Sequence, residues 1–438
     1  MSIGNDDGVT MADAAFSRHR RPSARLAGVR ALVGVQCLGA FNDNVYKTVV
    51  SLTAADIDLA GRGGAGLLSL SSIAFVAPYI LFSGYAGHVA DRFDKRSVLI
   101  AAKLVETALM ALAFMALTAG PIEALIVILF LLSTQATFFS PAKYGILPEL
   151  LAPAELSRAN GLMEMTRYVA VILGTAAGGL LCSIWQGQPG RLGALLIGIA
   201  AVGLLASLLI GRVPRPGGAR AFRINPWREI AEGMRRLSGD RCLAFAVAGI
   251  TCFEFLCALV MLDMILVGKA QMGLDDLQIG MLGVAVGLGA GAGSIAAARL
   301  SGDSIEPCLA FAGYLGIGAM LFGLAAASTA YAFTAAAFLG LGLFAGMVIV
   351  PLNALVQHAA GAEEKGRLIA TNNFLNMAGI VAASACLWLL HDVCGVSPRL
   401  ILVFAGLLSL SVALYAARRV PEATTRALAR LLASAGRR

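Results

Sequence analysis

Charged side chains inside apolar segments are the residues of this sequence best suited to do chemistry. Asp43 and Lys47 stand four residues apart in one such segment, and Glu164 and Arg167 stand three apart in another. Either spacing places both side chains on one face of a helix. An ionisable group in a membrane-spanning helix is costly unless it is paired or hydrated, so each one marks a candidate binding site. The pairs predict a polar site within the membrane, although Lys47 could also serve only to neutralise Asp43.

Two further groups of polar residues extend this set. Lys143 and Tyr144 lie where an apolar segment reaches a loop. Lys143 either binds a ligand there or extends its amine to the membrane surface. Glu254 and Asp263 lie in a later segment and are candidate carriers of a proton or of a ligand headgroup.

Lys103 and Glu106 form a third closely spaced pair, three residues apart in another apolar segment. A structural ion pair is the simpler interpretation, because the two charges neutralise each other on one helix face. We therefore expect a change at Lys103 to affect folding more than ligand affinity.

The composition indicates a protein that lies mostly in lipid. Of 438 residues, 58% are hydrophobic and 14% are charged, whereas a soluble domain is about a quarter charged. Twelve apolar segments are long enough to cross a bilayer: 29–52, 66–90, 97–119, 122–142, 159–184, 191–211, 242–267, 277–298, 308–328, 331–355, 367–390 and 398–417. They predict an all-α membrane protein with twelve transmembrane helices in two pseudo-symmetric six-helix bundles.

The distribution of Lys and Arg predicts the domain organisation and the orientation. The predicted parts are an N-terminal tail (1–28), a first bundle (29–211), a central linker (212–241), a second bundle (242–417) and a C-terminal tail (418–438). Basic residues gather in both tails, in the linker and in alternate loops, which places both termini in the cytoplasm. The linker contains the amphipathic run WREIAEGMRRL, which is typical of a connector lying on an anionic membrane surface.

Several other classes of function lack their signals in this sequence. The eight cysteines form no CxxC pair and the four histidines are scattered, so we expect no metal site and no cofactor. No GxxxxGK[ST] loop is present, which argues against nucleotide-driven transport. The first 28 residues are polar and rich in Arg, as expected of a cytoplasmic tail rather than a cleaved leader. The net charge of +8 follows from the tails and loops and does not indicate nucleic-acid binding.

An internal repeat relates the two predicted bundles. The first half contains SPAKYGILPEL followed by ANGLMEMTRY. The second half contains a similar succession, VPLNALVQ followed by ATNNFLN. In this alignment Lys143 corresponds to Asn353, and Glu164 corresponds to Asn376. The first half therefore keeps charges where the second half has amides. Parallel repeats of this kind form a substrate cavity at their interface.

The loop after the second segment, GHVADRFDKR, resembles the loop motif of the major facilitator superfamily. The resemblance assigns Gly87, Asp91 and Arg92 to gating, with the aspartate capping a neighbouring helix and pairing with an arginine. The sequence departs from the family by placing Asp94 where a glycine is preferred, which affects the expected turn.

Short motifs in several segments narrow the resemblance to bacterial lysophospholipid transporters. They are CLGAFNDNVYK, SPAKYGILPEL, ANGLMEMTRY, VPLNALVQ and ATNNFLN. The resemblance implies a flippase of the bacterial inner membrane and not an enzyme. Such a flippase moves lysophosphatidylethanolamine or similar lipids, which a cytoplasmic acyltransferase then uses as its substrate. The substrate-binding residues that we expect are Asp43, Asn44, Lys47, Lys143, Tyr144, Glu164, Arg167, Asn353 and Asn376.

The seventh segment departs from that family. It carries Glu254 and Asp263 in TCFEFLCALVMLDMIL, where the family often has an arginine or an aromatic-rich run. The alternative function is a proton-coupled major facilitator exporter of drugs or small metabolites, with Asp43, Glu164 or Glu254 as the proton carrier.

Overall fold

The computed structural model describes residues 22–59, 67–185, 187–211, 225–302, 304–327, 330–360 and 364–419. The regular elements in these ranges are all helices. The first six long helices are α2 (Pro22–Leu59), α3 (Leu67–Arg92), α4 (Lys95–Ala119), α5 (Ile122–Leu150), α6 (Pro153–Ile184) and α7 (Pro189–Ser207). The second six are α9 (Arg241–Leu266), α10 (Asp276–Ser301), α11 (Cys308–Ala327), α12 (Tyr331–Ala359), α13 (Lys365–Leu387) and α14 (Pro398–Arg419). Short π-helical turns, η1 (Val267–Gln271) and η2 (Trp388–Val393), continue α9 and α13. Most of the two predicted tails lies outside the described residues.

The helices confirm the prediction of twelve spans. Eleven described helices are long and apolar enough to cross a membrane. α2 falls outside that set because its FNDN stretch and Lys47 make it more polar, but at 38 residues it is long enough, and it packs against α5, α6 and α7. α5 and α6 extend beyond the predicted segments 122–142 and 159–184, because helix ends that leave the bilayer need not be apolar.

The apolar core of the first bundle is divided into two parts. One part contains Leu32, Leu99 and Ile146, and the other contains Tyr46, Leu109 and Leu129. Polar side chains separate them midway along the helices. This polar layer consists of Gln36 and Asp43 of α2, Lys103 and Glu106 of α4, and Ser133 and Gln135 of α5. The core of the second bundle is one continuous cluster.

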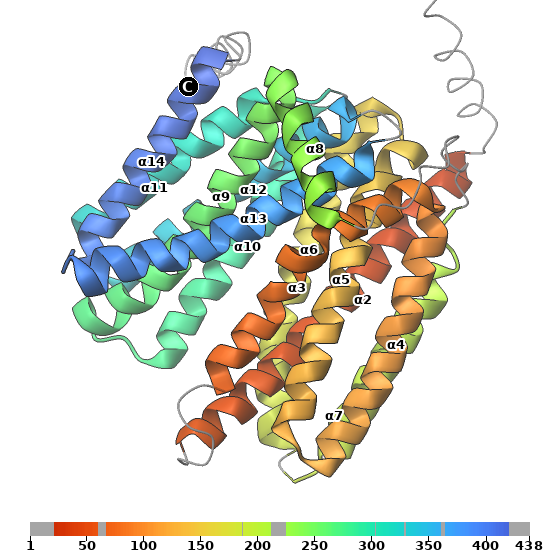
Figure 1. Ribbon diagram of the computed structural model, residues 1–438. Helices are drawn as coiled ribbons and strands as arrows, with labels where there is room; N and C mark the ends of the chain where they lie inside the picture. Colours follow the sequence, from red (N-terminus) through yellow and green to blue (C-terminus); the bar gives the residue numbers. More distant parts are fainter. Residues whose placement is uncertain are drawn as a thin grey trace, which may run out of the picture.

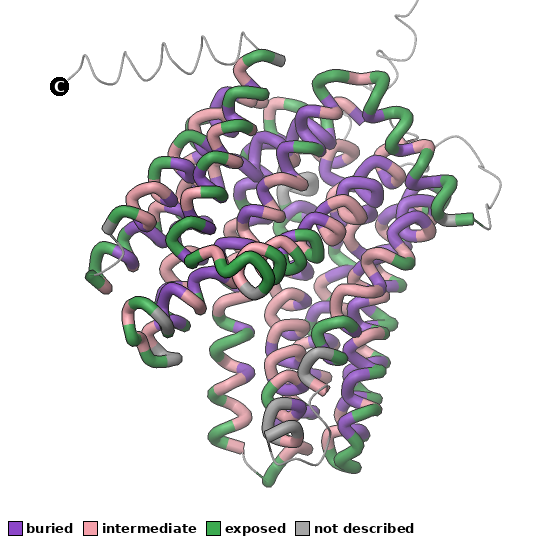
Figure 2. Tube along the Cα trace, turned by 60° about the vertical axis from the view of Figure 1, so that its left-hand side comes forward, coloured by how far each residue is buried: buried purple, intermediate pink, exposed green. Residues whose placement is uncertain are grey.

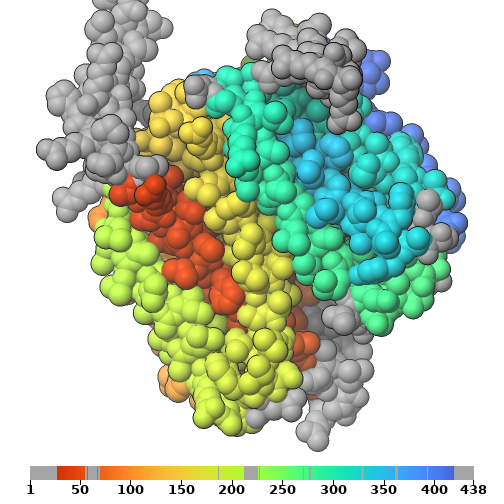
Figure 3. All heavy atoms as spheres, turned by 180° about the vertical axis from the view of Figure 1, so that it is seen from behind, coloured from red at the N-terminus to blue at the C-terminus, as the bar shows by residue number. Residues whose placement is uncertain are grey.

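The two bundles meet along α3 with α13 and along α6 with α10. A side-chain carbon at Gly87 of α3 would come 2.9 Å from the carbonyl oxygen of Gly366 in α13. A side-chain carbon at Gly161 of α6 would come 2.7 Å from the carbonyl oxygen of Ser294 in α10. Glycine therefore allows close contact of the helices at both crossings. Figure 3 shows α6 and α10 side by side along this boundary.

The helix α8 (Pro226–Gly239) crosses from one bundle to the other (Figure 1). It contacts α3 of the first bundle and α13 of the second, and Glu229 and Ile230 on its inner side are buried. A side-chain carbon at Gly233 would collide with the Thr371 hydroxyl, so α8 lies directly on α13. Trp227 packs edge-on against Phe374 with ring centroids 5.8 Å apart. The amphipathic pattern of the linker thus matches packing on the bundles. We call this end of the molecule the α8 face.

The outer surface of the helices is rich in exposed apolar side chains. Leu209, Leu205 and Met115 are 72%, 64% and 63% exposed. Figure 2 shows buried positions on the inner sides of the helices and exposed positions on the outer sides. A soluble protein rarely exposes apolar area on this scale, so this surface is suited to lipid.

Candidate substrate cavity

A cavity of about 370 Å³ lies between the two bundles. α2, α3, α4, α5 and α6 line one side of it, and α9, α12 and α13 line the other. The predicted residues that line it are Asp43, Asn44, Lys143, Tyr144, Glu164, Arg167, Glu254, Asn353 and Asn376. Residues far apart in the sequence are thus brought to one place at the bundle interface.

Glu164 is the centre of a hydrogen-bonded group in this cavity. Its side chain is buried, and Arg167 Nε donates to Glu164 Oε2 at 2.8 Å. The Tyr144 hydroxyl donates to Glu164 Oε1 at 2.8 Å, and Asn353 Nδ2 of the second bundle approaches the same oxygen at 3.4 Å. A buried carboxylate needs such donors to remain charged. Glu164 therefore positions Arg167 and Tyr144 and is not free to bind a ligand cation in this conformation.

Arg167 and Lys143 present positive charge to the cavity. The Arg167 side chain is 31% exposed and stacks on Tyr168, with its guanidinium carbon 4.3 Å from the ring centroid. Lys143 Nζ lies 4.3 Å from the centroid of the Tyr144 ring and makes no ion pair with any described residue. These two cations at the cavity wall are suited to a phosphate group. Lys143 has no carboxylate partner among the described residues, and Arg167 uses its Nε for Glu164, which leaves its terminal nitrogens as donors.

Two other carboxylates of the cavity, unlike Glu164, are not surrounded by hydrogen-bond donors, and they lie on different sides of it. Glu254 of α9 lines it from the second bundle, and Asp43 of α2 lines it from the first. No described residue donates a hydrogen bond to Asp43 Oδ1, although that atom is buried. Asn44 Nδ2 instead donates to the carbonyl oxygen of Ala40 in its own helix, at 2.7 Å.

Two of the predicted residues lie elsewhere. Lys47 is not among the described residues that line the cavity, and its Nζ lies 3.9 Å from the centroid of the Phe75 ring. It is not ion-paired with Asp43. Asp263 is 0% exposed in α9, outside the cavity lining, and neither of its carboxylate oxygens has a hydrogen-bond partner among the described residues.

Lys103 and Glu106 form the ion pair that their spacing predicted, with Lys103 Nζ 2.6 Å from Glu106 Oε2. Both side chains also line the cavity, although they are only 2% exposed. The pair therefore belongs both to the polar layer and to the wall of the site.

Hydrogen bonds between the bundles close the cavity toward the α8 face. The side-chain amides of Asn160 and Gln357 exchange two hydrogen bonds of 2.9 and 2.8 Å and are both buried. Asn373 Nδ2 donates to Ser140 Oγ at 2.9 Å. The sequence did not indicate these contacts, because the two partners of each lie in opposite bundles.

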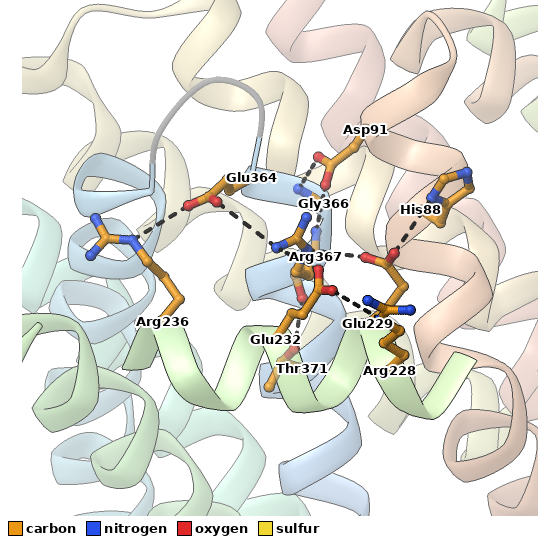
Figure 4. A network of polar contacts seen from close by, with 10 residues as sticks. All are labelled: His88, Asp91, Arg228, Glu229, Glu232, Arg236, Glu364, Gly366, Arg367 and Thr371. Carbon is orange, nitrogen blue, oxygen red and sulfur yellow. Dashed lines mark hydrogen bonds and ion pairs between the residues drawn. The ribbon is translucent and has the colours of Figure 1, made fainter. Parts of the chain in front are cut away.

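The loop motif lies at the α8 face and also joins the bundles (Figure 4). Asp91 accepts hydrogen bonds from the backbone N–H groups of Gly366 and Arg367, at 2.6 and 2.9 Å, and so caps α13. Arg92 is exposed, with its guanidinium carbon 5.7 Å from the Phe93 ring centroid. Asp94, which departs from the family pattern, caps α4 by accepting from Ser97 N.

Arg367 connects this cap to α8. Its guanidinium lies 3.1 Å from Glu229, 3.4 Å from Glu232 and 3.8 Å from Glu364 (Figure 4). Glu229 also lies 3.9 Å from His88 of α3. Since these groups belong to α3, α8 and α13, one polar network holds the two bundles and the linker helix together.

These features define a class of protein. Two six-helix bundles related by a repeat, with a charged cavity at their interface and a loop aspartate that caps a helix of the opposite bundle, form the architecture of a secondary transporter. The sequence profile of the Major Facilitator Superfamily matches residues 32–384. The chain belongs to the major facilitator superfamily.

Comparison with individual proteins narrows the relationship. The chain is 32% identical over 373 residues to the lysophospholipid transporter LplT of Klebsiella pneumoniae (strain 342), covering 82% of this chain and 87% of that protein. It is 28% identical over 352 residues to LplT of Escherichia coli (strain SE11), covering 78% and 83%. These matches confirm the resemblance that the sequence motifs indicated.

Solved structures show the same fold at lower identity. The human organic anion transporter MFSD10 superposes with a TM-score of 0.73 at 16% identity, covering 90% of this chain and 99% of that one. The Escherichia coli fucose:proton symporter FucP superposes with a TM-score of 0.70 at 15% identity, with the same coverage. At this identity the likeness concerns the fold alone.

Proposed function

We propose that this protein moves lysophospholipids, such as lysophosphatidylethanolamine, across the bacterial inner membrane by alternating access. The observation behind the proposal is that Lys143 and Arg167 lie on the same wall of the interface cavity. The chain that carries them is similar to LplT over most of its length. A lysophospholipid carries a phosphate that needs such donors. On this proposal the protein acts as a transporter and not as an enzyme.

The headgroup is assigned to the charged residues of the cavity. Lys143 and the terminal nitrogens of Arg167 bind the phosphate, while Glu164 and Tyr144 hold Arg167 in place. The unpartnered carboxylates Asp43 and Glu254 are suited to an ethanolamine ammonium. Polar contacts from Asn44, Asn353 and Asn376 complete the site. Lys47 contributes only if it leaves Phe75 during the transport cycle.

The single acyl chain needs apolar contacts only. Val171, Ile250, Ile349, Met377 and Ile380 line the cavity beside the charged residues. A lipid bound with its phosphate at Lys143 can therefore keep its chain against an apolar wall, where burial contributes about 0.8 kcal/mol per methylene.

The gating assignment follows from the contacts at the α8 face. Gly87 permits the close crossing of α3 and α13, and Asp91 caps α13 across the bundle interface. These contacts must separate if the cavity is to open toward the α8 face. Arg92 lies at the surface beside them and is assigned to the same loop. We further propose that this face and both termini are cytoplasmic, and that the product supplies a cytoplasmic acyltransferase.

Uptake of labelled lysophosphatidylethanolamine tests the function directly. Spheroplasts of a strain that lacks its own lysophospholipid transporter are assayed with and without this protein, and with the Lys143→Ala/Arg167→Ala double variant at matched expression. We expect uptake that depends on the intact protein and is lost in the double variant. Equal uptake with and without the protein, together with extrusion of drugs or small metabolites, would instead identify it as an exporter.

A further inference from the structure

Asp263 of α9 is a buried acid that the proposed headgroup site does not use. Its side chain is 0% exposed, and no described residue donates a hydrogen bond to either of its carboxylate oxygens. Within one turn of it, α9 contributes Leu259, Val260, Met264 and Val267 to the continuous apolar core of the second bundle. An unpaired charge in such surroundings is very costly, so a buried acid without donors holds its proton instead. Asp263 is therefore suited to bind a proton.

Asp263 and Glu254 point to opposite sides of α9. They are nine residues apart, which is about two and a half helical turns. Glu254 lines the cavity, whereas Asp263 lies outside the cavity lining. A proton on Asp263 is thus separate from the headgroup contacts, although it is carried by a helix of the cavity wall.

His391 of η2 lies at the same level as Asp263 on the neighbouring helix. α9 and α13 both begin at the α8 face and pack along each other (Figure 1). A side-chain carbon at Gly379 of α13 would lie 3.2 Å from the carbonyl oxygen of Thr251 in α9. Asp263 lies twelve residues beyond Thr251. His391 lies the same twelve residues beyond Gly379, or about 18 Å along each helix axis. The charge of His391 accordingly acts on Asp263.

The hydrogen bond of His391 determines which ring nitrogen can take up a proton. Its Nδ1 lies 3.1 Å from the carbonyl oxygen of Val396. A carbonyl oxygen can only accept, so Nδ1 carries the hydrogen and Nε2 is the basic atom of the neutral ring. The ring is half-buried near the end of the bundle that lies away from the α8 face. Since histidine gains and loses a proton near neutral pH, His391 is placed to pass protons between that end and the core.

The other titratable side chains near this end leave Asp263 without a partner. Those described on the elements packed around it are Lys269 of η1, Asp275 before α10, Tyr331 of α12, Cys386 of α13, Cys394 after η2 and Arg399 of α14. None of them forms a hydrogen bond or an ion pair with Asp263. Lys269 and Arg399 are exposed, and Asp275 caps α10. α8 contacts the other end of α9. His391 is therefore the titratable group that acts on Asp263.

We propose that Asp263 binds a proton that is coupled to transport, and that His391 exchanges this proton with the end opposite the α8 face. The inference rests on the proposed function for the coupled substrate. In loading, hydronium protonates Nε2 of His391, and the imidazolium then gives one proton to the Asp263 carboxylate, which leaves both side chains neutral. The apolar packing around Asp263 favours the loaded form in this closed arrangement. Release requires an arrangement of α9 and α13 in which the carboxylate is hydrated or paired, so the proton distinguishes two states of the protein.

The proton on Asp263 is detected without lipid, so that its failure is distinguishable from failure of the proposed substrate. Infrared spectra of the purified protein contain a carbonyl stretching band for each protonated carboxyl group. At neutral pH, we expect one such band to be present in the unmodified protein and missing in Asp263→Asn. The absence of any difference in this region would overturn the proton site.

Asp240→Asn is the matched control for the infrared measurement. Asp240 stands at the start of the same helix and accepts hydrogen bonds from the backbone N–H groups of Cys242 and Leu243. Asn is an equally good residue at the start of a helix, so the fold should persist. Because its donors keep the Asp240 carboxylate charged, this variant should retain the band. Loss of the band in Asp240→Asn and not in Asp263→Asn would also overturn the assignment.

Coupling is measured as the movement of labelled lysophosphatidylethanolamine in proteoliposomes that are acidic on the side opposite the α8 face. With a gradient of about one pH unit, we expect the ratio of lipid between the leaflets to rise by up to about tenfold, for one coupled proton. Asp263→Asn should move lipid without responding to the gradient. His391→Asn, whose amide can still donate to Val396, should respond less than the unmodified protein.

The two measurements separate this inference from the proposed function. Lipid movement by the unmodified protein that ignores the gradient would overturn the coupling and leave the proposed function intact. The infrared band without any movement of lipid would support the proton site and contradict the proposed function.

Discussion

At the scale of single residues, the cavity contains two kinds of charged group. Some are held by protein hydrogen bonds and fix the shape of the site, and others have no ion-pair partner and are available to a ligand. Glu164 is saturated by Arg167, Tyr144 and Asn353. Lys143 has no ion-pair partner among the described residues and lies against Tyr144. A buried carboxylate with full hydrogen bonding gains little from a ligand, whereas an unpaired amine gains an ion pair. This difference decides which substitutions should weaken binding and which should weaken the fold.

Removal of a phosphate donor should weaken substrate binding without loss of the fold. In Lys143→Ala, we expect the affinity for lysophosphatidylethanolamine to fall by ~2–5 kcal/mol, because the phosphate then lies in the cavity without its cation. Binding is measured by isothermal titration or by ligand-induced thermal stabilisation. The control is Lys47→Ala, which removes the same kind of charge from a side chain that lies on Phe75. Equal affinity losses in the two variants would contradict the assignment of the phosphate site.

Removal of Lys103 should act on stability instead. Lys103→Ala leaves the Glu106 carboxylate buried without its 2.6 Å partner, so we expect a loss of ~3–5 kcal/mol in stability. The measurement is the unfolding temperature and the expression level in membranes. The paired variant Lys103→Met/Glu106→Leu removes both charges and should recover much of the loss. If the single variant is as stable as the unmodified protein, the pair has no structural role.

At the scale of elements, the α8 face is held by a helix cap and a linker helix. Asp91 of α3 caps α13, and Arg367 of α13 binds carboxylates of α8. Opening of the cavity toward this face must break these contacts, because they cross the boundary between the bundles. They therefore stabilise this closed arrangement, and their residues lie outside the cavity lining.

Asp91→Asn should change the transport rate and leave binding intact. The amide retains one acceptor but places its NH₂ group against a backbone N–H of α13, so the cap loses one of two charge-assisted bonds, worth ~1–2 kcal/mol. We expect slower uptake together with normal stabilisation by lysophosphatidylethanolamine. Arg92→Ala, at an exposed neighbour, is the comparison and should have a smaller effect. A folded Asp91→Asn protein that no longer responds to ligand would show that Asp91 acts in binding.

At the scale of the whole molecule, the distribution of charge predicts how the fold sits in the membrane. Basic side chains gather on the α8 face, including Arg228, Arg235, Arg236 and Arg241 on α8 and at the start of α9. The positive-inside rule then predicts that this face is cytoplasmic. The opposite ends of the helices carry few basic residues.

Reporters inserted at Asp240 and at Gly187 should therefore give opposite locations. Asp240 lies between α8 and α9, and Gly187 lies between α6 and α7 at the other end of the bundle. We expect an enzymatic reporter that works only in the cytoplasm to be active at Asp240 and inactive at Gly187. The reverse result would invert the orientation, and identical activity at both points would contradict the order of the spans.

The sequence alone determined the number of helices, the repeat and the residues that line much of the cavity. Apolar segments about 20 residues long can only span a bilayer as helices, since backbone groups in lipid must bond within the segment. Asp43, Lys143, Glu164 and Arg167 were identified because a charge in such a segment requires a reason. The motif around Asp91 was recognisable from local spacing, and its helix-capping role is visible in the structure.

Only the tertiary structure decided which charges are satisfied and which are free. Asp43 and Lys47 share a helix face in the sequence, yet Lys47 lies on Phe75 and Asp43 faces the cavity. The Lys103–Glu106 pair of α4 lies against α2 at Gly39, and the Asn160–Gln357 contact joins residues 197 positions apart. Helical periodicity gives the direction of a side chain around its own axis, but its partners depend on how the helices pack, and no local pattern contains that information.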